Sequence, residues 1–391
     1  MVHLYCRSGT LAAVVSLALA VALQGRAAAV EFAVSANDGK AALENGASVT
    51  LKAPVADNVL VLDISARPPK VIGEVEAPAS VVGPPQSVAV APDQTYALVT
   101  AAFKLDPADA TKTVPDDRAT VIDLVSSPPK AIGTLRVGKG AAGVSINRAG
   151  TLALVANRSE GTVSVLSING RTLGVVGKVA LGDDKSGPSH AVFSRDGKMA
   201  LVTRDNDHKI SVLSVDGTKV EYTKRDINAG LRPNGIDMGA KGDIAIVANI
   251  GPGQGDADTI SVIDVKAAPP RVVNTVTVGQ TPEGLKMSPD GNFVAVGVMN
   301  GSNKAKDSPF FHDNGLLQVW RVDGTALAKV AEAPVGHWCQ GIVWSKDSKR
   351  LFVQCMVEKE IMAFDFTGRA LKAAGAISTK GGPAGFRTAE P

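Results

Sequence analysis

The chain of 391 residues carries 41 basic and 38 acidic side chains, which gives a formal net charge of +3 at pH 7. These charges are interspersed along the sequence, so no charged run argues for binding to nucleic acid or to an anionic membrane. Aromatic residues make up only 4% of the chain, whereas glycine (40 residues) and proline (22 residues) are frequent. This composition is typical of many short strands joined by tight turns.

Residues 1–29 have the pattern of a secretion signal. Arg7 gives a basic start, residues 11–23 form an apolar run, and Ala27–Ala29 supplies a cleavage site of small residues. The apolar run is shorter than the ~20 residues that span a bilayer, so we expect cleavage rather than a membrane anchor. We expect residues 30–391 to be a periplasmic or secreted protein without a membrane span.

A repeat runs through the remainder of the chain. Six turns align along it, each between two short apolar segments with period-2 alternation. The turns centre on Asp93, Ala149, Asp196, Lys241, Asp290 and Asp347. A third strand-like run occurs seven times, at 59–63, 120–123, 162–166, 209–213, 259–264, 316–320 and 360–365. A fourth run ends most units, as at 135–138, 179–182 and 276–279.

Four short strands in each repeat predict the blades of a β-propeller. Seven third strands with only six turns indicate that one blade is divided between the two ends of the chain. Residues 383–386 resemble 282–285 and are predicted to form the innermost strand of that blade. Its outer strands are predicted at 48–52, 58–63 and 71–75. The sequence thus predicts an all-β, single-domain, seven-bladed propeller over residues 30–391, whose closure removes exposed strand edges.

Two cysteines remain after the expected cleavage. Cys339 and Cys355 lie eight residues before and after Asp347, the centre of a predicted hairpin turn. They should therefore face each other on neighbouring strands, and an exported protein favours their oxidation. We predict a disulfide, with paired free thiols as the alternative.

Several segments resemble the repeat of the YVTN family of β-propellers. They are Leu154–Asn157, Ile246–Asn249, Ser288–Gly291, Thr162–Val165 and Ile260–Asp264. The resemblance covers essentially all of residues 30–391 and implies a propeller of the kind that bacteria often export. It implies little about activity, because the family includes lactonase-like enzymes, binding proteins and surface proteins.

Equivalent positions of the repeat should form rings around the central channel. The position six residues before each turn is glycine in most blades, but His190 in one. The preceding position is mostly polar: Gln86, Ala142, Ser189, Asn234, Glu283, Gln340 and Ala384. Two residues further back lie Arg232 and Trp338. We expect His190, Arg232 and Glu283 to converge near the channel mouth, where they would suit a carboxylate-bearing or lactone ligand. The alternative is a solvated rim without a ligand.

Some lactonase-type propellers carry a histidine at this kind of strand start, an arginine in the next blade and an acidic residue about 16 positions later. His190 and Arg232 are similar to the first two. The acidic position falls near Asn249, which is not acidic, so Glu283 would have to substitute from the next blade.

Other candidates lie in loops. Arg204, Asp205 and His208 crowd one loop and could bind an anion. Two insertions, Lys104–Arg118 and Gly301–Gly315, should lie on the face that propellers commonly use for binding. The second insertion carries the aromatic cluster Phe310, Phe311 and His312, which could contact a partner or cover the channel.

No motif indicates a cofactor or metal. There is no Gly-x-Ser-x-Gly, Cys-x-x-Cys-His or phosphate-loop pattern, and Asp256 with Asp258 gives too few carboxylates for a calcium site. We interpret the chain as an exported, monomeric binding protein for a small molecule or a periplasmic protein. The alternative is a lactonase-like hydrolase or isomerase that uses His190, Arg232 and Glu283. Predicted ligand contacts are Gln86, Arg204, His208, Asn234, Asn249, Phe310, Phe311, His312, Trp338 and Gln340.

Overall fold

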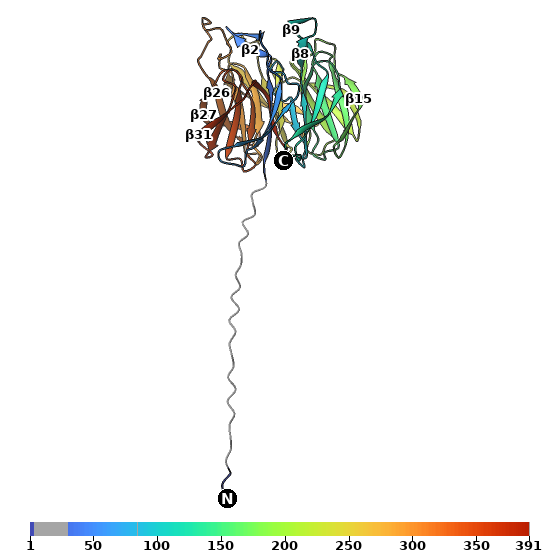
Figure 1. The fold of residues 1–391 in the computed structure, drawn as a ribbon. Coiled ribbons are helices and arrows are strands. Elements are labelled where there is room, and N and C mark those ends of the chain that lie inside the picture. Colours follow the sequence, from blue (N-terminus) through green and yellow to red (C-terminus); the bar gives the residue numbers. More distant parts are fainter. Residues whose placement is uncertain (4–29, 84, 391) are drawn as a thin grey trace.

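The computed structural model describes residues 1–3, 30–83 and 85–390. The predicted secretion signal therefore lies almost wholly outside the described residues. The described part of the chain forms seven four-stranded antiparallel sheets arranged as a ring of blades, together with two small hairpins and no helix (Figure 1). The predicted all-β, seven-bladed propeller is confirmed. Within these described ranges no helix is long and apolar enough to cross a membrane.

The blades follow one another along the chain, each with its innermost strand next to the central channel. From inside to outside, the strands are β32 (Gly382–Thr388), β1 (Phe32–Asp38), β4 (Asn58–Asp63) and β5 (Lys70–Glu76); β6 (Val88–Val90), β7 (Tyr96–Thr100), β10 (Arg118–Asp123) and β11 (Lys130–Arg136); β12 (Ala141–Ile146), β13 (Leu152–Asn157), β14 (Thr162–Asn169) and β15 (Thr172–Ala180); β16 (Pro188–Phe193), β17 (Met199–Arg204), β18 (Lys209–Asp216) and β19 (Lys219–Ile227); β20 (Pro233–Met238), β21 (Ile244–Asn249), β22 (Asp258–Asp264) and β23 (Arg271–Gly279); β24 (Pro282–Met287), β25 (Phe293–Val298), β26 (Gly315–Asp323) and β27 (Ala326–Val335); β28 (Cys339–Trp344), β29 (Arg350–Cys355), β30 (Glu360–Phe366) and β31 (Leu371–Ser378).

Burial within each blade explains why strands of this composition form. Every residue of a second strand such as β21 is buried, because its two faces pack against the two neighbouring blades. The outermost strands, such as β23, alternate exposed and half-buried residues along most of their length, as expected for an edge with one solvated face. Small β-branched side chains fill most of the space between blades. Phe293, Trp344 and Phe366 form an aromatic cluster, with ring centroids 5.0–6.4 Å apart.

The ring is closed by pairing of the first and last strands. β1 pairs with β32 on one side and with β4 on the other, so that Ala36 faces Gly385 and Val59. The predicted inner strand at 383–386 and the predicted outer strands at 58–63 and 71–75 are confirmed. The prediction that 48–52 supplies a blade strand is wrong: Ala47–Thr50 (β3) pairs only with Ala41–Glu44 (β2) in a small hairpin. The buried segment Phe32–Asp38 occupies that place in the blade.

The predicted disulfide is confirmed. Cys339 and Cys355 are directly opposite each other on β28 and β29, and their sulfur atoms are bonded. Both side chains are buried.

Three insertions project from one face of the ring, which we call the loop face. They are the β2–β3 hairpin, the hairpin of β8 (Phe103–Asp106) and β9 (Asp109–Pro115), and the 301–315 loop. β3 lies against β9, and a Cβ atom on Gly46 would lie 2.4 Å from the Ala305 backbone nitrogen, so the three insertions are neighbours. The C-terminal end lies at the opposite face (Figure 1), which we call the terminal face.

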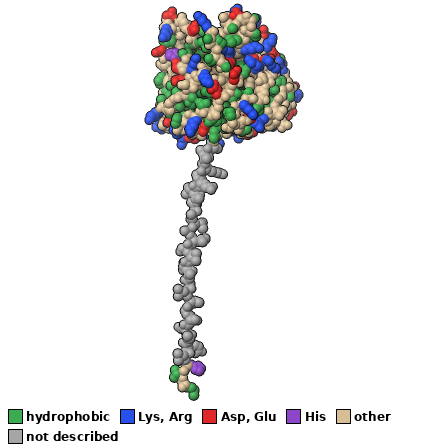
Figure 2. Space-filling model, in the orientation of Figure 1, with side chains coloured by type: hydrophobic (Ala, Val, Ile, Leu, Met, Phe, Trp, Pro, Cys, Tyr) green, Lys and Arg blue, Asp and Glu red, His purple; other side chains and the backbone are tan. Residues whose placement is uncertain are grey.

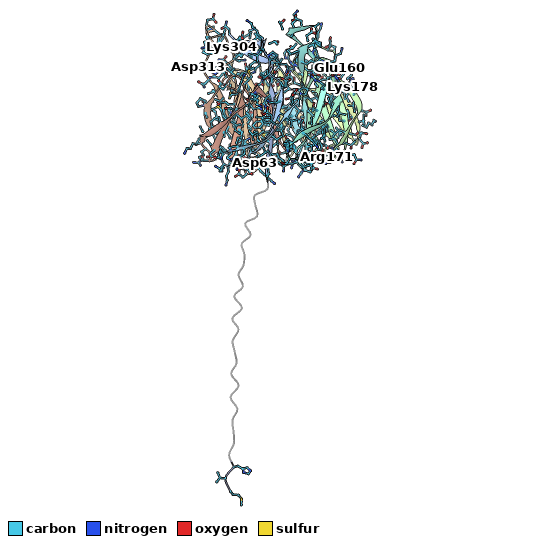
Figure 3. The ribbon with its side chains drawn as sticks, in the orientation of Figure 1. Asp63, Glu160, Arg171, Lys178, Lys304 and Asp313 are labelled. Atoms are coloured by element: carbon cyan, nitrogen blue, oxygen red, sulfur yellow. A yellow bond between two sulfur atoms is a disulfide. The ribbon has the colours of Figure 1, made fainter. Side chains whose placement is uncertain are left out.

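Figure 3 shows the loop face and the terminal face by labelled residues. Lys304 of the 301–315 loop lies at the loop face, whereas Asp63 and Arg171 lie at the terminal face. Basic, acidic and apolar side chains are mixed over the visible surface (Figure 2), which agrees with the interspersed charges of the sequence.

Candidate functional site

The first residues of the inner strands surround the channel mouth at the loop face. Each inner strand starts at this face, because it follows the connection from the outermost strand of the preceding blade. Glycine follows the mouth position in most blades because neighbouring backbones approach closely there. A Cβ on Gly143 would lie 2.4 Å from the Ser189 carbonyl oxygen, and one on Gly284 would lie 1.7 Å from that of Gln340. The backbones of neighbouring inner strands therefore approach each other closely at the mouth, as predicted.

A network of two arginines and one carboxylate forms one side of the mouth. Asp205, which follows β17, is fully buried. Arg158, which follows β13, donates from Nη1 to Asp205 Oδ1 (2.9 Å) and from Nη2 to Oδ2 (2.7 Å). Its Nη1 also donates to Ser189 Oγ (2.6 Å). Arg232, which precedes β20, approaches Asp205 Oδ2 with its Nη2 at 3.6 Å. The sequence interpretation missed Arg158 and placed Asp205 in a different cluster.

Glu283 on β24 supplies an acidic group within electrostatic range of this network. Its Oε1 accepts a hydrogen bond of 3.1 Å from Gln340 Nε2, and the side chain remains partly exposed. Burial raises the pKa of Glu283 from 4.5 to about 7. The Asp205 carboxylate also raises this pKa, whereas the Gln340 hydrogen bond and the positive charges of Arg232 and Arg158 oppose the shift. Near neutral pH this carboxyl is therefore divided between its protonated and ionised forms.

Three buried amide side chains complete the ring. Gln86, Asn234 and Gln340 occupy equivalent positions in their blades and are 0–4% exposed. Gln86 Nε2 and Oε1, Asn234 Oδ1 and Gln340 Oε1 have no hydrogen-bond partner among the described residues. Buried polar atoms are nearly always hydrogen-bonded, so a group of unpartnered ones at a channel mouth indicates a place for polar ligand atoms or water.

His190 lies deeper in the channel than the other two predicted catalytic residues. It is 3% exposed, and its Nδ1 is 2.9 Å from the Ile236 carbonyl oxygen, so Nδ1 carries the proton. Burial lowers its pKa well below 6.5, and positive charge on Arg387 and Lys286 lowers it further. The structure thus brings Arg232 and Glu283 together, while the charges that most affect His190 belong to the channel interior. A catalytic role for His190 stays a prediction.

Two predicted ligand contacts are used within the fold. Asn249 Nδ2 donates to the Ala229 carbonyl oxygen and to the hydroxyls of Thr259 and Ser261. Arg204 is 5% exposed and its Nη2 lies 2.9 Å from Asp207 Oδ2. Asn249 Oδ1 and Arg204 Nε have no hydrogen-bond partner among the described residues, and a ligand contact at either side chain stays a prediction.

The other predicted contacts lie around the mouth. His208 is exposed, and its Nδ1 accepts a 3.1 Å hydrogen bond from the Arg232 backbone nitrogen, so it positions the backbone of that arginine. Trp338 is half-buried, packs beside Val81 and Met356, and donates from its backbone to Ser302 Oγ (3.3 Å).

The aromatic cluster belongs to the 301–315 loop. Phe310 is 43% exposed, but one side of its ring lies against the backbone of Gly255, where a Cβ would come within 2.3 Å of the ring. The neighbouring Phe311 donates its backbone N–H to the Ser308 carbonyl oxygen (3.1 Å). His312 Nδ1 lies 2.8 Å from the Asn300 carbonyl oxygen. These contacts fix the loop against its own blade and the preceding one.

The electrostatic balance of the mouth depends on pH. Arg158 and Arg232 are opposed by Asp205 and, when it is ionised, by Glu283. Among the residues that the structure describes, no group of three or more His, Cys, Asp or Glu side chains is placed to hold a metal ion. The arrangement offers one proton-transfer group, one accessible guanidinium and several amides.

Comparisons with known proteins agree with this architecture. A family model described as "Lactonase, 7-bladed beta-propeller" matches residues 180–306. The resemblance to lactonase-like propellers is confirmed. The matched segment of this lactonase-like propeller includes His190, Asp205, Arg232 and Glu283. No curated protein sequence matched the chain.

Solved structures extend the likeness to nearly the whole chain. A putative 6-phosphogluconolactonase from Bacteroides fragilis has a TM-score of 0.70 and 14% identity, covering 92% of this chain and 98% of its own. A structure described as Pseudomonas aeruginosa periplasmic gluconolactonase has a TM-score of 0.65 and 18% identity, covering 92% of this chain and 100% of its own. A Kuenenia stuttgartiensis hydrazine synthase chain has a TM-score of 0.59 and 16% identity, covering 78% and 90%. At these identities the likeness shows the fold alone.

Proposed function

We propose that this lactonase-like propeller hydrolyses the lactone of a small hydroxylated acid at the channel mouth, with Glu283 as general base. The observation that carries the proposal is a carboxyl whose pKa is raised to about 7 within range of an accessible guanidinium. A group with a pKa near the working pH can both accept and return a proton, which is what general acid–base catalysis requires.

Arg232 is the arginine suited to hold the oxygen that becomes negatively charged. Its Nη2 is 3.6 Å from Asp205, and its Nη1 is 3.4 Å from the Gly251 carbonyl oxygen. Both distances exceed those of strong charge-assisted hydrogen bonds, about 2.7–2.9 Å. Arg158 makes two short bonds to Asp205 and is already engaged. Arg232 can therefore turn towards a ligand without breaking a strong bond.

The reaction follows from these positions. Gln340 holds Oε1 of Glu283, which leaves Oε2 to accept a proton from a water molecule as its oxygen attacks the lactone carbonyl carbon. Arg232 stabilises the negative charge that develops on the carbonyl oxygen. The ring C–O bond then breaks, and the protonated Glu283 returns its proton to the leaving ring oxygen. The product is the open hydroxy acid.

The surrounding amides support a substrate rich in hydroxyl groups. Gln86, Asn234 and Gln340 present unpartnered carbonyl or amide groups that can accept and donate hydrogen bonds to a polyol chain. The family model at 180–306 and the two structures described as lactonases support the same class of substrate. Sugar-acid lactones are therefore the substrates to test first.

A panel of aldonolactones with Glu283→Gln tests the proposal. We expect a 10²- to 10⁴-fold loss of kcat, the usual contribution of a general base, and a wild-type kcat/KM that rises with pH and levels off above about pH 7. Arg232→Gln should raise KM and lower kcat. Glu221→Gln, an outer-strand glutamate that is 60% exposed, is the matched control. Unchanged turnover in Glu283→Gln, or no turnover of any lactone by the wild type, would contradict the proposal.

A second candidate function is binding of a sugar acid without catalysis, which the three unpartnered amide side chains at the mouth favour. In that case a sugar acid should raise the Tm of the wild type, and Gln86→Ala or Asn234→Ala should remove the shift, while lactone hydrolysis is absent. Ligand at 100 times its Kd stabilises a folded protein by about 2.7 kcal/mol, which a thermal-shift measurement detects readily.

We also propose that the protein acts in the periplasm or outside the cell. The signal-like residues 1–29 and the periplasmic lactonase of similar fold support this. N-terminal sequencing of the protein from a periplasmic fraction should find a start near residue 30, whereas an intact N-terminus in the cytoplasmic fraction would contradict it.

A further inference from the structure

A separate cavity lies in the channel below the mouth, towards the terminal face. Its volume is about 70 Å³, and His190, Val144, Asp237, Arg387 and Glu390 are among the residues that line it. A cavity of this size holds roughly five water-sized groups. It is therefore too small for a sugar acid and suits water or a small ion.

A ring of equivalent inner-strand residues crosses the channel at this depth, four positions before each turn. Its members are Ala89, Ser145, Val192, Asp237, Lys286, Val343 and Arg387. Three of the seven carry charge and are 3–5% exposed. Buried charges are normally paired, so their partners decide what the cavity can accept.

The two carboxylates near the cavity are already engaged. Lys286 Nζ lies 3.0 Å from Asp237 Oδ1 and 2.6 Å from Glu390 Oε1. Asp237 Oδ2 also accepts a 2.7 Å hydrogen bond from the Met287 backbone nitrogen. Lys286 thus has two acidic partners, and both carboxylates are directed towards it.

Arg387 makes no ion pair within 4 Å among the described residues, although its charge acts on Asp237 and Glu390 at longer range. Arg387 is 4% exposed, and its Nη1 donates a 3.2 Å hydrogen bond to the Phe386 carbonyl oxygen. Nη2 has no hydrogen-bond partner among the residues the structure describes. A buried guanidinium with an unmet donor facing a cavity is costly unless something in the cavity satisfies it. Arg148 and Arg195 also line the cavity and add positive charge.

We propose that the cavity binds a small inorganic anion of about chloride size, held by Arg387 Nη2. The ion accepts the hydrogen bond that the described residues leave unmade at Arg387 Nη2, and the charges of Arg148 and Arg195 in the lining help to attract it. This site is independent of the proposed lactonase site, because it lies below the mouth and uses different residues.

Thermal unfolding in chloride tests the site. At constant ionic strength, sodium chloride replaces sodium isethionate, whose anion is larger. We expect Tm to rise by about 2 °C when chloride reaches roughly ten times its Kd, and to rise further with the logarithm of the chloride concentration. Arg387→Gln should remove the chloride dependence. Arg148→Gln, which alters an exposed lining arginine, is the control and should retain it. A wild-type Tm that is the same in both salts would overturn the proposal.

Crystals of the wild-type protein grown in sodium bromide give a second measurement that needs no variant to fold. The expected result is an anomalous peak inside the cavity, within about 3.5 Å of Arg387 Nη2, because bromide resembles chloride in charge and scatters anomalously. Peaks confined to the surface, with only water beside Arg387, would contradict the proposal. Arg387→Lys should retain a weaker peak if charge rather than shape attracts the ion.

Discussion

Arg158 and Asp205 form a two-point ion pair between neighbouring blades, with both guanidinium–carboxylate distances below 3.0 Å. Asp205 is fully buried, whereas the Arg158 side chain is 20% exposed. A parallel pair of bonds fixes the relative position of the two groups better than one bond does. The pair thereby fixes the carboxylate that Arg232 Nη2 approaches at 3.6 Å.

Removing Arg158 should destabilise the fold because it leaves the buried Asp205 carboxylate with only the more distant Arg232. We expect Arg158→Met to lower the free energy of unfolding by about 3 kcal/mol, as breaking a buried pair does. Arg158→Met combined with Asp205→Asn should recover part of the loss. Lys178→Met, which breaks the surface pair with Glu160, should cost at most about 1 kcal/mol. Urea denaturation measures all three, and equal losses for the buried and surface pairs would contradict this account.

Glu283 should make stability fall as pH rises. Its folded-state pKa of about 7 lies above its ordinary 4.5, so between these values the folded protein binds a proton that the unfolded chain has released. Raising the pH through this window therefore lowers the free energy of unfolding. Glu283→Gln should remove the fall and be more stable than the wild type at pH 8 by about 2 kcal/mol, less than the full shift because the carboxyl is partly exposed.

The difference in the free energy of unfolding between wild type and Glu283→Gln reports the titration of Glu283 alone, because all other groups titrate in both proteins. Denaturation curves at pH 4.5, 6 and 8 measure it. A difference that is independent of pH would show that the carboxyl titrates normally.

The Cys339–Cys355 disulfide should stabilise the ring by restricting the unfolded chain. It closes a loop with a sequence separation of 16, for which chain entropy predicts about 3 kcal/mol. Replacing both cysteines by alanine should lower the free energy of unfolding by about this amount, plus a smaller loss of buried contacts. Wild type unfolded with and without reductant provides the comparison; identical curves would show that the bond adds nothing.

The contact of Phe310 with Gly255 should hold the 301–315 loop in place. Gly255 has φ of +96°, and a Cβ there would meet the Phe310 ring at 2.3 Å, so Gly255→Ala must displace one of them. We expect faster amide exchange over 301–315 with little change in Tm, because the loop lies outside the blades. Gly324→Ala is the control, since its φ of +58° is also positive but no atom lies within 4 Å of the added Cβ. Equal exchange in both variants would contradict a role for the ring contact.

Most of the fold was predictable because its signals are local. Alternating apolar residues and turns such as that at Asp290 recur often enough to count the blades, and the cysteine spacing around Asp347 identified opposite positions on one hairpin. The order of the closing blade was not predictable in full. Phe32–Asp38 and Ala47–Thr50 both look like short strands, and only pairing with Gly382–Thr388, at the other end of the chain, decides which of them enters the sheet.

The site was predictable only where the repeat was followed along the first strand. The equivalent positions at the start of the inner strands identified Glu283, and the residues two positions earlier identified Arg232. Aligning the ends of the second strands as well would have placed Arg158 and Asp205 at equivalent positions in neighbouring blades. How deep each side chain lies in the channel was harder to predict from the sequence. Along a strand each residue advances ~3.3 Å, and successive side chains point to opposite sides. His190, one position beyond Ser189, therefore lies in a different environment from the residues at the mouth.

The pairing of β1 with β32 also has a consequence for how the molecule is made. On its inner side Ala36 pairs with Gly385 of β32, so a growing chain can assemble six blades while the seventh still lacks its inner strand. The ring stays open, with an unsatisfied strand edge, until Gly382–Thr388 has left the ribosome. Contacts between such distant segments form slowly. Any loss of residues 382–388 should therefore affect solubility more than the loss of seven surface residues elsewhere, because it leaves a permanent site for pairing with other chains.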